Sequence, residues 1–162
     1  RHLRTNKRNV WAVGDIIGRQ MFTHAGDKEA EIAWQNATKK KKITMDFGLV
    51  PHAVFTYPQI ASVGMTEEEA RKNHEILLGK ANYSDTVMGD ALAEHNGFAK
   101  AIVEKATGKI LGFHIIGPDA SLLIQEVVNA IANNHDVKSI TGSMHIFPAL
   151  SGLIPEALNN LA

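Results

Sequence analysis

Gly14 and Asp15 end the first apolar stretch of the chain and form its first candidate ligand site. A carboxylate at the end of a strand can accept hydrogen bonds from the hydroxyl groups of a ligand. A helix is predicted to begin near Phe22 or Thr23, and the first turn of a helix offers free backbone N–H groups and positive partial charge. These features are compatible with ligand binding, but a Gly-Asp pair alone is a weak signal, and the residues by themselves favour an ordinary structural turn.

The chain contains eight histidines and no cysteine. A disulfide, a thiolate zinc site and a cysteine nucleophile are therefore excluded within these 162 residues. The histidines are scattered, with no His-x-x-x-His pair and no His-Glu-x-x-His helix, so the sequence predicts no metal site. His145 is the histidine of most interest because it lies in residues 144–152, a segment that also contains Pro148 and Ser151.

The first part of the chain is predicted to form one strand and one helix. Residues 9–15 are typical of a short buried strand. Residues 21–38 carry alanine and isoleucine at helical spacing and predict a helix. Four lysines at 39–42 follow, which we interpret as a solvated helix end favoured by the helix dipole. Nucleic-acid binding or a localisation signal is the alternative for this basic run.

The second part mixes strands and helices. Short strands are predicted at residues 53–57, 60–64 and 76–83, and a β-hairpin is predicted from residues 97–104 and 109–117. Thr66 and Glu69 have the spacing of a helix capping box. Asp119 can cap a helix with a wide apolar face, and residues 151–161 predict a short terminal helix. The pattern indicates an α+β fold, an antiparallel β-sheet flanked by helices.

Composition is that of a globular protein without a strongly charged partner. The chain is 44% hydrophobic and 21% charged, with a formal net charge of zero. Neutral charge gives no electrostatic reason to expect nucleic-acid or membrane binding. No apolar run approaches the roughly 20 residues that span a bilayer, and the first ten residues do not resemble a signal peptide. We therefore expect a cytoplasmic protein.

Residues 10–15, VWAVGD, are similar to the apolar-x-Ala-x-Gly-Asp motif of FAD-dependent pyridine nucleotide–disulfide oxidoreductases of the dihydrolipoamide dehydrogenase and mercuric reductase type. The resemblance implies that Asp15, beside Gly14, binds a ribitol hydroxyl of FAD. It also implies that Met21, Phe22 and Thr23 form a helix N-terminus facing the flavin. The helix dipole would then stabilise negative charge on a reduced flavin.

Residues 51–67, PHAVFTYPQIASVGMTE, resemble the start of the dimerisation domain of the same family. Residues 97–100 and 110–117 resemble its central hairpin, so the motifs cover almost the whole chain in family order. The resemblance implies that residues 1–46 are the end of an FAD-binding domain and residues 47–162 the dimerisation domain. The Gly-x-Gly-x-x-Gly loop, the redox cysteine pair and the NAD domain are absent, and the chain begins with Arg, so we interpret it as a C-terminal fragment.

Residues 144–152, MHIFPALSG, resemble the family segment His-x-His-Pro-x-x-Ser-Glu, in which the second His and the Glu form an acid–base pair. Phe147 and Gly152 occupy those two positions here and can neither carry nor orient a proton. Glu156 lies one helical turn beyond Gly152, about 6 Å along the axis, which is too far to make the same contact. His145 matches the first, structural His of the pattern and is only a weak catalytic candidate. A cis bond before Pro148 is expected by the same resemblance.

The leading hypothesis is a homodimerising fragment of an FAD-dependent NAD(P)–disulfide oxidoreductase. The full-length parent would pass hydride between NAD(P)H and a disulfide or dithiol substrate through FAD. We expect the fragment itself to bind FAD weakly, if at all, and to be inactive. The alternatives are a non-catalytic dimerising paralogue and a flavoprotein reductase that acts on a non-disulfide acceptor.

Overall fold

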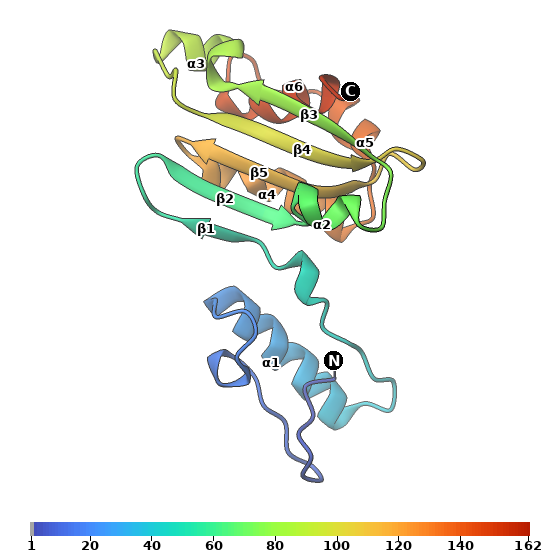
Figure 1. Ribbon diagram of the computed structural model, residues 1–162. Helices are drawn as coiled ribbons and strands as arrows, with labels where there is room; N and C mark the ends of the chain where they lie inside the picture. Colours follow the sequence, from blue (N-terminus) through green and yellow to red (C-terminus); the bar gives the residue numbers. More distant parts are fainter. Residues whose placement is uncertain (1) are drawn as a thin grey trace. The chain divides into compact units, whose positions relative to one another are not determined.

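The computed structural model describes residues 2–162, which contain one five-stranded antiparallel sheet (Figure 1). The order across the sheet is β1-β2-β5-β4-β3. The last two strands in the sequence, β4 and β5, are therefore both inner strands of the sheet. The bounds are β1 His52–Val54, β2 Gln59–Gly64, β3 Ile76–Asn82, β4 Phe98–Glu104 and β5 Ile110–Gly117. The predicted α+β fold is confirmed.

The β4–β5 hairpin follows the sequence prediction closely. The backbone N–H of Glu104 donates to the carbonyl of Lys109 at 2.9 Å, and that of Gly108 donates to Glu104 at 2.8 Å. Gly108 has a φ of 70°, a left-handed conformation that glycine adopts without steric cost. A register shift at Ile102 and Val103 marks a bulge in the ladder. The hairpin therefore forms where strand-forming residues flank a turn of suitable chemistry.

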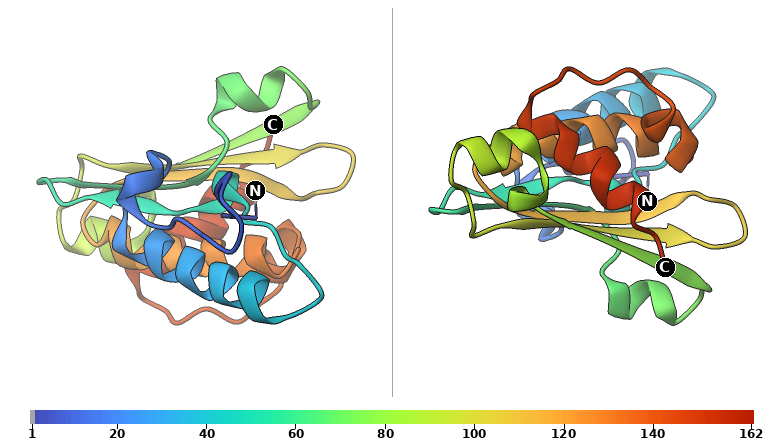
Figure 2. Two further views of the ribbon diagram at one scale, coloured as in Figure 1. Left: turned by 90° about the horizontal axis from the view of Figure 1, so that it is seen from below. Right: turned by 90° about the horizontal axis from the view of Figure 1, so that it is seen from above.

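Three helices cover one face of the sheet, as the edge-on views in Figure 2 show. They are α4 Ala120–Ala132, α5 Val137–Thr141 and α6 Leu153–Asn159. Helix α4 packs on β2 and β5, whereas α6 packs on β3 and β4. The core between these layers is fully buried and includes Phe113, Ile115, Val127, Leu153 and Ile154. Residues 144–152 lead directly into α6, so the packing of α6 on the sheet also holds this segment in place.

The N-terminus of α4 is capped differently from the sequence prediction. Asp119 occupies the N-cap position but has a φ of 55°, and its side chain makes no capping bond. An N-cap side chain reaches the helix from extended backbone, which the left-handed conformation of Asp119 prevents. Instead, Gln59 Oε1 accepts hydrogen bonds from Ser121 N at 3.2 Å and from Ser121 Oγ at 2.9 Å. A side chain of β2 therefore replaces the local cap.

Helix α2, Glu67–Arg71, lies on the opposite face of the sheet and begins with the predicted capping box (Figure 2). Thr66 Oγ1 accepts from the backbone N–H of Glu69, and the Glu69 carboxylate accepts from the backbone N–H of Thr66. Hydrogen bonding to Thr66 holds the pKa of Glu69 below its ordinary value. Ala70 of this helix is completely buried. The cap thus fixes the start of a helix that covers part of the open sheet face.

Replacing Thr66 with alanine should lower the free energy of unfolding by about 1 kcal/mol, because the substitution removes the cap from α2. Urea unfolding at fixed protein concentration measures the effect. Glu68→Ala is the matched control, since the Glu68 carboxylate makes only an exposed ion pair with Lys72. Equal midpoints for Thr66→Ala and Glu68→Ala would contradict the stabilising role of the cap.

The first compact unit extends to Val50, and the second runs from Pro51 to Ala162. This division falls four residues after the boundary expected at 46/47. The first unit contains α1, Thr23–Thr38, which confirms the predicted helix. Its small core is formed by Leu3, Ala25, Ile32, Ala33, Met45 and Val50.

The buried strand predicted at residues 9–15 does not form. Only an isolated bridge joins Trp11 to Arg4, and Val10 is exposed. A strand is stabilised by a neighbour that pairs with its backbone. Among the described residues of the first unit, residues 3–5 alone supply such pairing. Residues 11–14 are only partly buried and residues 9, 10 and 15 are exposed, so the prediction of a buried strand is wrong in both burial and conformation.

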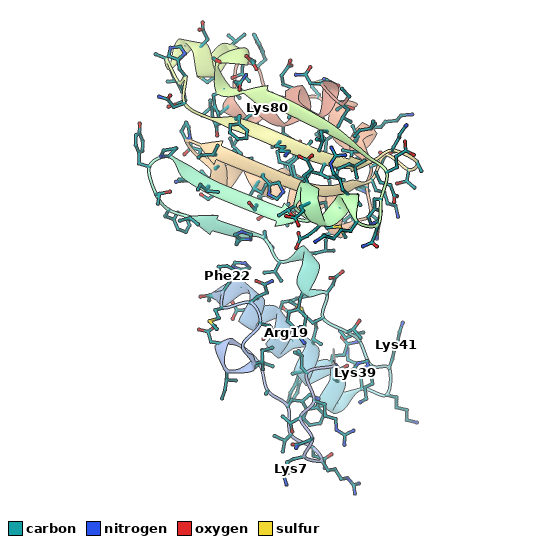
Figure 3. The ribbon with its side chains drawn as sticks, viewed as in Figure 1. Lys7, Arg19, Phe22, Lys39, Lys41 and Lys80 are labelled. Carbon is teal, nitrogen blue, oxygen red and sulfur yellow. The ribbon has the colours of Figure 1, made fainter. Side chains whose placement is uncertain are left out.

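The lysine run follows the end of α1. Lys42 Nζ donates to the carbonyl of Asn36 at 2.5 Å and to that of Lys39 at 2.6 Å, so it satisfies carbonyls at the helix end. Lys39 and Lys41 are exposed side chains of this loop (Figure 3).

No helix among residues 2–162 is both long and apolar enough to cross a membrane.

Candidate functional site

Residues 144–152 link α5 to α6 and carry the candidate acid–base positions. The Phe147–Pro148 peptide bond is cis, which confirms the sequence prediction. Met144, Ile146 and Phe147 are highly exposed, with relative accessibilities of 101%, 81% and 78%. His145 points the other way and is partly buried. Three apolar side chains of the segment therefore face solvent, and the His145 side chain faces the protein.

A cavity of about 270 Å³ lies beside this segment and brings together most of the predicted positions. His145, Phe147, Gly152 and Glu156 all contribute to its lining. The opposite wall comes from four residues that sequence reasoning did not select, Asp85, Thr86, Val87 and Met88. The cavity therefore unites two segments about sixty residues apart in the chain.

The second wall is held by a chain of hydrogen bonds that ends in helix α3, Val87–Ala91. Tyr83 is fully buried, and its hydroxyl donates to the carbonyl of Pro118 at 2.7 Å. Burial raises the pKa of Tyr83 above its ordinary value, so the hydroxyl stays a donor. Thr86 Oγ1 donates to the carbonyl of Tyr83 at 2.8 Å and accepts from Gly89 N at 3.1 Å. These bonds cap α3 and fix the wall of the cavity.

His145 anchors the terminal segment to α4. Its Nε2 lies 3.0 Å from Glu126 Oε1, and its Nδ1 lies 3.1 Å from the carbonyl oxygen of Ser143. Both ring nitrogens of His145 therefore already have a hydrogen-bond partner within the chain. The geometry favours the structural interpretation of His145 over a catalytic one.

A double-mutant cycle of His145→Ala and Glu126→Ala should give a coupling free energy of about 0.5–1 kcal/mol, because the pair is only partly shielded from solvent. Urea unfolding of the two single variants and the double variant supplies the values. The exposed Glu68–Lys72 pair of α2 is the control and should show much weaker coupling. Coupling no larger than in that control would contradict the role of His145 as an anchor.

Gly14 and Asp15 lie in the first unit beside the start of α1. Gly14 has a φ of 75°, and Asp15 opens a single 3-10 turn that ends at Ile17. Phe22 is the N-cap of α1 and provides no side-chain cap. The aromatic rings of Phe22 and His24 stack with centroids 5.5 Å apart (Phe22 is labelled in Figure 3). The predicted residues thus gather on one turn and one helix start.

A larger cavity of about 800 Å³ lies elsewhere in the first unit. Ala12, Ile17, Arg19 and Phe47 are among its lining residues, whereas Gly14 and Asp15 are not. The guanidinium of Arg19, which is labelled in Figure 3, lies 5.4 Å from the centre of the Phe47 ring. The predicted ligand turn therefore reaches this cavity through Ile17, but Gly14 and Asp15 do not line it.

Residues 50–158 match the family model described as pyridine nucleotide-disulphide oxidoreductase, dimerisation domain. The chain belongs to this family. Among curated pyridine nucleotide-disulphide oxidoreductases, a dihydrolipoyl dehydrogenase from Synechocystis is 36% identical over 154 residues, which cover 92% of this chain and 32% of the relative. A mycothione reductase from Mycobacterium tuberculosis is 35% identical over 165 residues, covering 98% and 36%. The chain thus spans about a third of the length of these relatives.

Solved structures show the same fold. LpdA from Mycobacterium tuberculosis matches with a TM-score of 0.90 and 25% identity, covering 97% of this chain and 34% of that one. The HOCl-induced flavoprotein disulfide reductase RclA from Escherichia coli matches with a TM-score of 0.87 and 25% identity, covering 98% and 37%. The resemblance to the pyridine nucleotide-disulphide oxidoreductases inferred from sequence is therefore confirmed.

Proposed function

We propose that the chain is the homodimerising part of an FAD-dependent NAD(P)–disulfide oxidoreductase in which the family's His/Glu pair is missing. The observation that carries the proposal is the exposure of the apolar residues Met144, Ile146 and Phe147 in a domain of the dimerisation family. Clustered apolar side chains on a surface mark sites of protein association. A second copy of the chain is the partner, because identical subunits most often pair about a two-fold axis.

The neighbouring helix α3 enlarges this apolar surface. Val87 lines the same cavity as Ile146 and Phe147 and is itself exposed. His145 anchors the segment from behind, so its apolar side chains are presented without a large loss of conformational freedom on association. Pre-positioned apolar groups beside this cavity suit a protein interface.

Loss of proton chemistry follows from the residue types at the two family positions. Phe147 has no ionisable group and Gly152 has no side chain. Missing general acid–base catalysis typically lowers a rate by about 10²–10⁴-fold. The side chain of His145 is already committed to Glu126 and Ser143. We therefore propose that the chain contributes an interface but no proton donor or acceptor.

The residues around Asp15 fit the end of a flavin site. Gly14 and Gly18 both have positive φ, and a Cβ built on either would meet no atom within 4 Å. The space beside the turn is thus open, Asp15 is exposed, and the start of α1 lacks a side-chain cap. Asp15 would accept a ribityl hydroxyl, while Met21, Phe22 and Thr23 would present the positive end of α1. FAD, when bound, supplies the hydride chemistry of the parent protein.

A second candidate function is favoured by the same two positions. With Phe147 and Gly152 in place, a flavoprotein reductase could still act on an acceptor that needs no proton relay from a thiol. A non-catalytic dimerising paralogue is the remaining alternative. The complete gene product distinguishes the three: a redox cysteine pair upstream supports the disulfide oxidoreductase, a flavin domain without the pair supports the second, and no flavin domain supports the third.

Sedimentation velocity over a range of protein concentrations tests the dimer. The complete gene product that contains this chain should be a dimer at micromolar concentration. Ile146→Asp places a charge in the proposed interface and should raise the dimer Kd at least about tenfold, or about 1.4 kcal/mol. Thr107→Asp, at the exposed tip of the β4–β5 turn, is the control and should leave Kd unchanged. A wild-type monomer at every concentration would refute the proposal.

A further inference from the structure

Glu29 is a fully buried carboxylate in the middle of α1. Its Oε2 accepts a hydrogen bond from the backbone N–H of Gly14 at 2.5 Å. Its Oε1 is buried and has no hydrogen-bond partner among the described residues. Burial of a carboxylate with incomplete hydrogen bonding is costly, and an apolar side chain of similar size would pack without that cost. The residue type at this position therefore points to a role beyond filling the core.

Gly14, whose N–H donates to the Glu29 side chain, has an unusual backbone conformation. The φ of 75° and ψ of −160° suit glycine alone. Helix α1 also approaches it closely: a Cβ built on Gly26 would lie 3.5 Å from Gly14 Cα. The short bond from Glu29 thus holds Gly14 against the helix at the point where the chain turns into Asp15.

Asp15 depends on this anchor because it is the next residue and opens the 3-10 turn. The N–H of Ile17 donates to the carbonyl of Gly14 at 3.1 Å, and the N–H of Gly18 donates to that of Asp15 at 3.0 Å. Among residues 2–162, the bond to Glu29 is the hydrogen bond that ties Gly14 to helix α1. Glu29 is therefore placed to set the position of the turn and of the Asp15 carboxylate.

We propose that Glu29 is a positioning residue for flavin binding, which acts through the N–H of Gly14 to orient Asp15 toward the ribityl chain. The proposal rests on the proposed function, in which Asp15 binds FAD. Glu29 itself does not touch the cofactor. Its contribution is to keep a strained, glycine-dependent turn in the binding conformation before FAD arrives, which lowers the cost of ordering that turn on binding.

Asn36 provides a matched contrast in the same helix. It is also almost fully buried, but its side chain is well satisfied: Nδ2 donates to the carbonyls of His2 and Ile43, and Oδ1 accepts from Ile43 N at 2.8 Å. Asn36 thus fastens the distal end of α1, away from the Gly14 turn. Loss of Asn36 should destabilise the first unit without altering the position of Asp15.

Titration of the flavin-free complete gene product with FAD, followed by quenching of flavin fluorescence, tests the proposal. Glu29→Ala should raise the Kd for FAD at least about tenfold, which corresponds to about 1.4 kcal/mol. Glu29→Gln retains an oxygen that can accept from Gly14 N, so it should raise Kd by a smaller factor. Asn36→Ala should lower the melting temperature of the flavin-free protein at least as much as Glu29→Gln, yet keep Kd within about twofold of wild type.

Near-ultraviolet circular dichroism identifies any variant that fails to fold. If Glu29→Ala does not fold, Glu29→Gln carries the test, and a wild-type Kd in that variant overturns the inference. An Asn36→Ala variant that weakens FAD binding as much as Glu29→Ala also overturns it, because general destabilisation would then explain both. A wild-type protein that takes up no FAD overturns the proposed function, and the inference with it. Wild-type uptake with an unchanged Kd in the Glu29 variants overturns the inference alone.

Discussion

The double replacement Phe147→His with Gly152→Glu is expected to raise the rate of dithiol oxidation by the complete gene product about 10²–10⁴-fold. An imidazole at 147 would supply the general base, and a carboxylate at 152 would orient it. Both positions line the same 270 Å³ cavity. Gly152 has an ordinary helical φ of −57°, and a Cβ built there would meet no atom within 4 Å, so a larger side chain fits.

The activity of the double variant should depend on pH in a way that the wild-type activity does not. A histidine base works only when neutral, so kcat should rise as pH increases through about 6–7. Phe147→His alone should recover less activity, because nothing then orients the ring. Leu122→His, on the exposed surface of α4, adds a histidine outside the cavity and should have no effect. A double variant no faster than wild type, at equal flavin content, would contradict the idea that these two positions limit the chemistry.

Phe113→Ala should lower the free energy of unfolding by about 3–5 kcal/mol, because it removes a buried aromatic ring and leaves a cavity. Phe113 lies on β5 in the centre of the sheet, is fully buried and belongs to the core beneath the helices. Urea unfolding measures the change, at a single protein concentration because dimerisation adds to apparent stability. Phe55→Ala is the control: Phe55 is mostly exposed, and its loss should change stability by less than about 0.5 kcal/mol.

The same substitution also separates the roles of core and interface. If the sheet and helices are the scaffold for residues 144–147, destabilisation by Phe113→Ala should weaken dimerisation only under conditions that unfold the domain. A loss of stability below about 1 kcal/mol would show that this residue is not the packing centre that its burial indicates.

Much of the fold was predictable because its signals are local. The β4–β5 hairpin, β3, α1 and the Thr66 capping box all follow from residues within a few positions of one another. Helices α3 and α5 were missed because five residues are too few to show helical periodicity. The cap of α4 was assigned to Asp119 because the real contributor, Gln59, lies 62 residues from Ser121. Local reasoning cannot select such a partner.

The candidate site was likewise predictable only where its signals are local. The resemblance of residues 144–152 identified the segment, but not the second wall of its cavity. The wall has a local signal, since Thr86 caps a helix, yet nothing in the sequence places it beside Phe147. The bonds from His145 to Glu126 and from Glu29 to Gly14 likewise join residues that are separate in sequence. These hydrogen bonds form only in the packed structure, so the sequence alone does not predict them.

Hydroxyl-radical footprinting of Met144 tests most directly whether the terminal segment is a subunit interface. Met144 is fully exposed in the single chain. In the wild-type dimer its oxidation rate should fall at least severalfold below that in the Ile146→Asp variant, measured at a concentration at which sedimentation shows the variant to be monomeric, because a second copy covers it. Equal oxidation rates in a confirmed wild-type dimer and in that monomer would contradict the account, since the subunits would then associate through another surface.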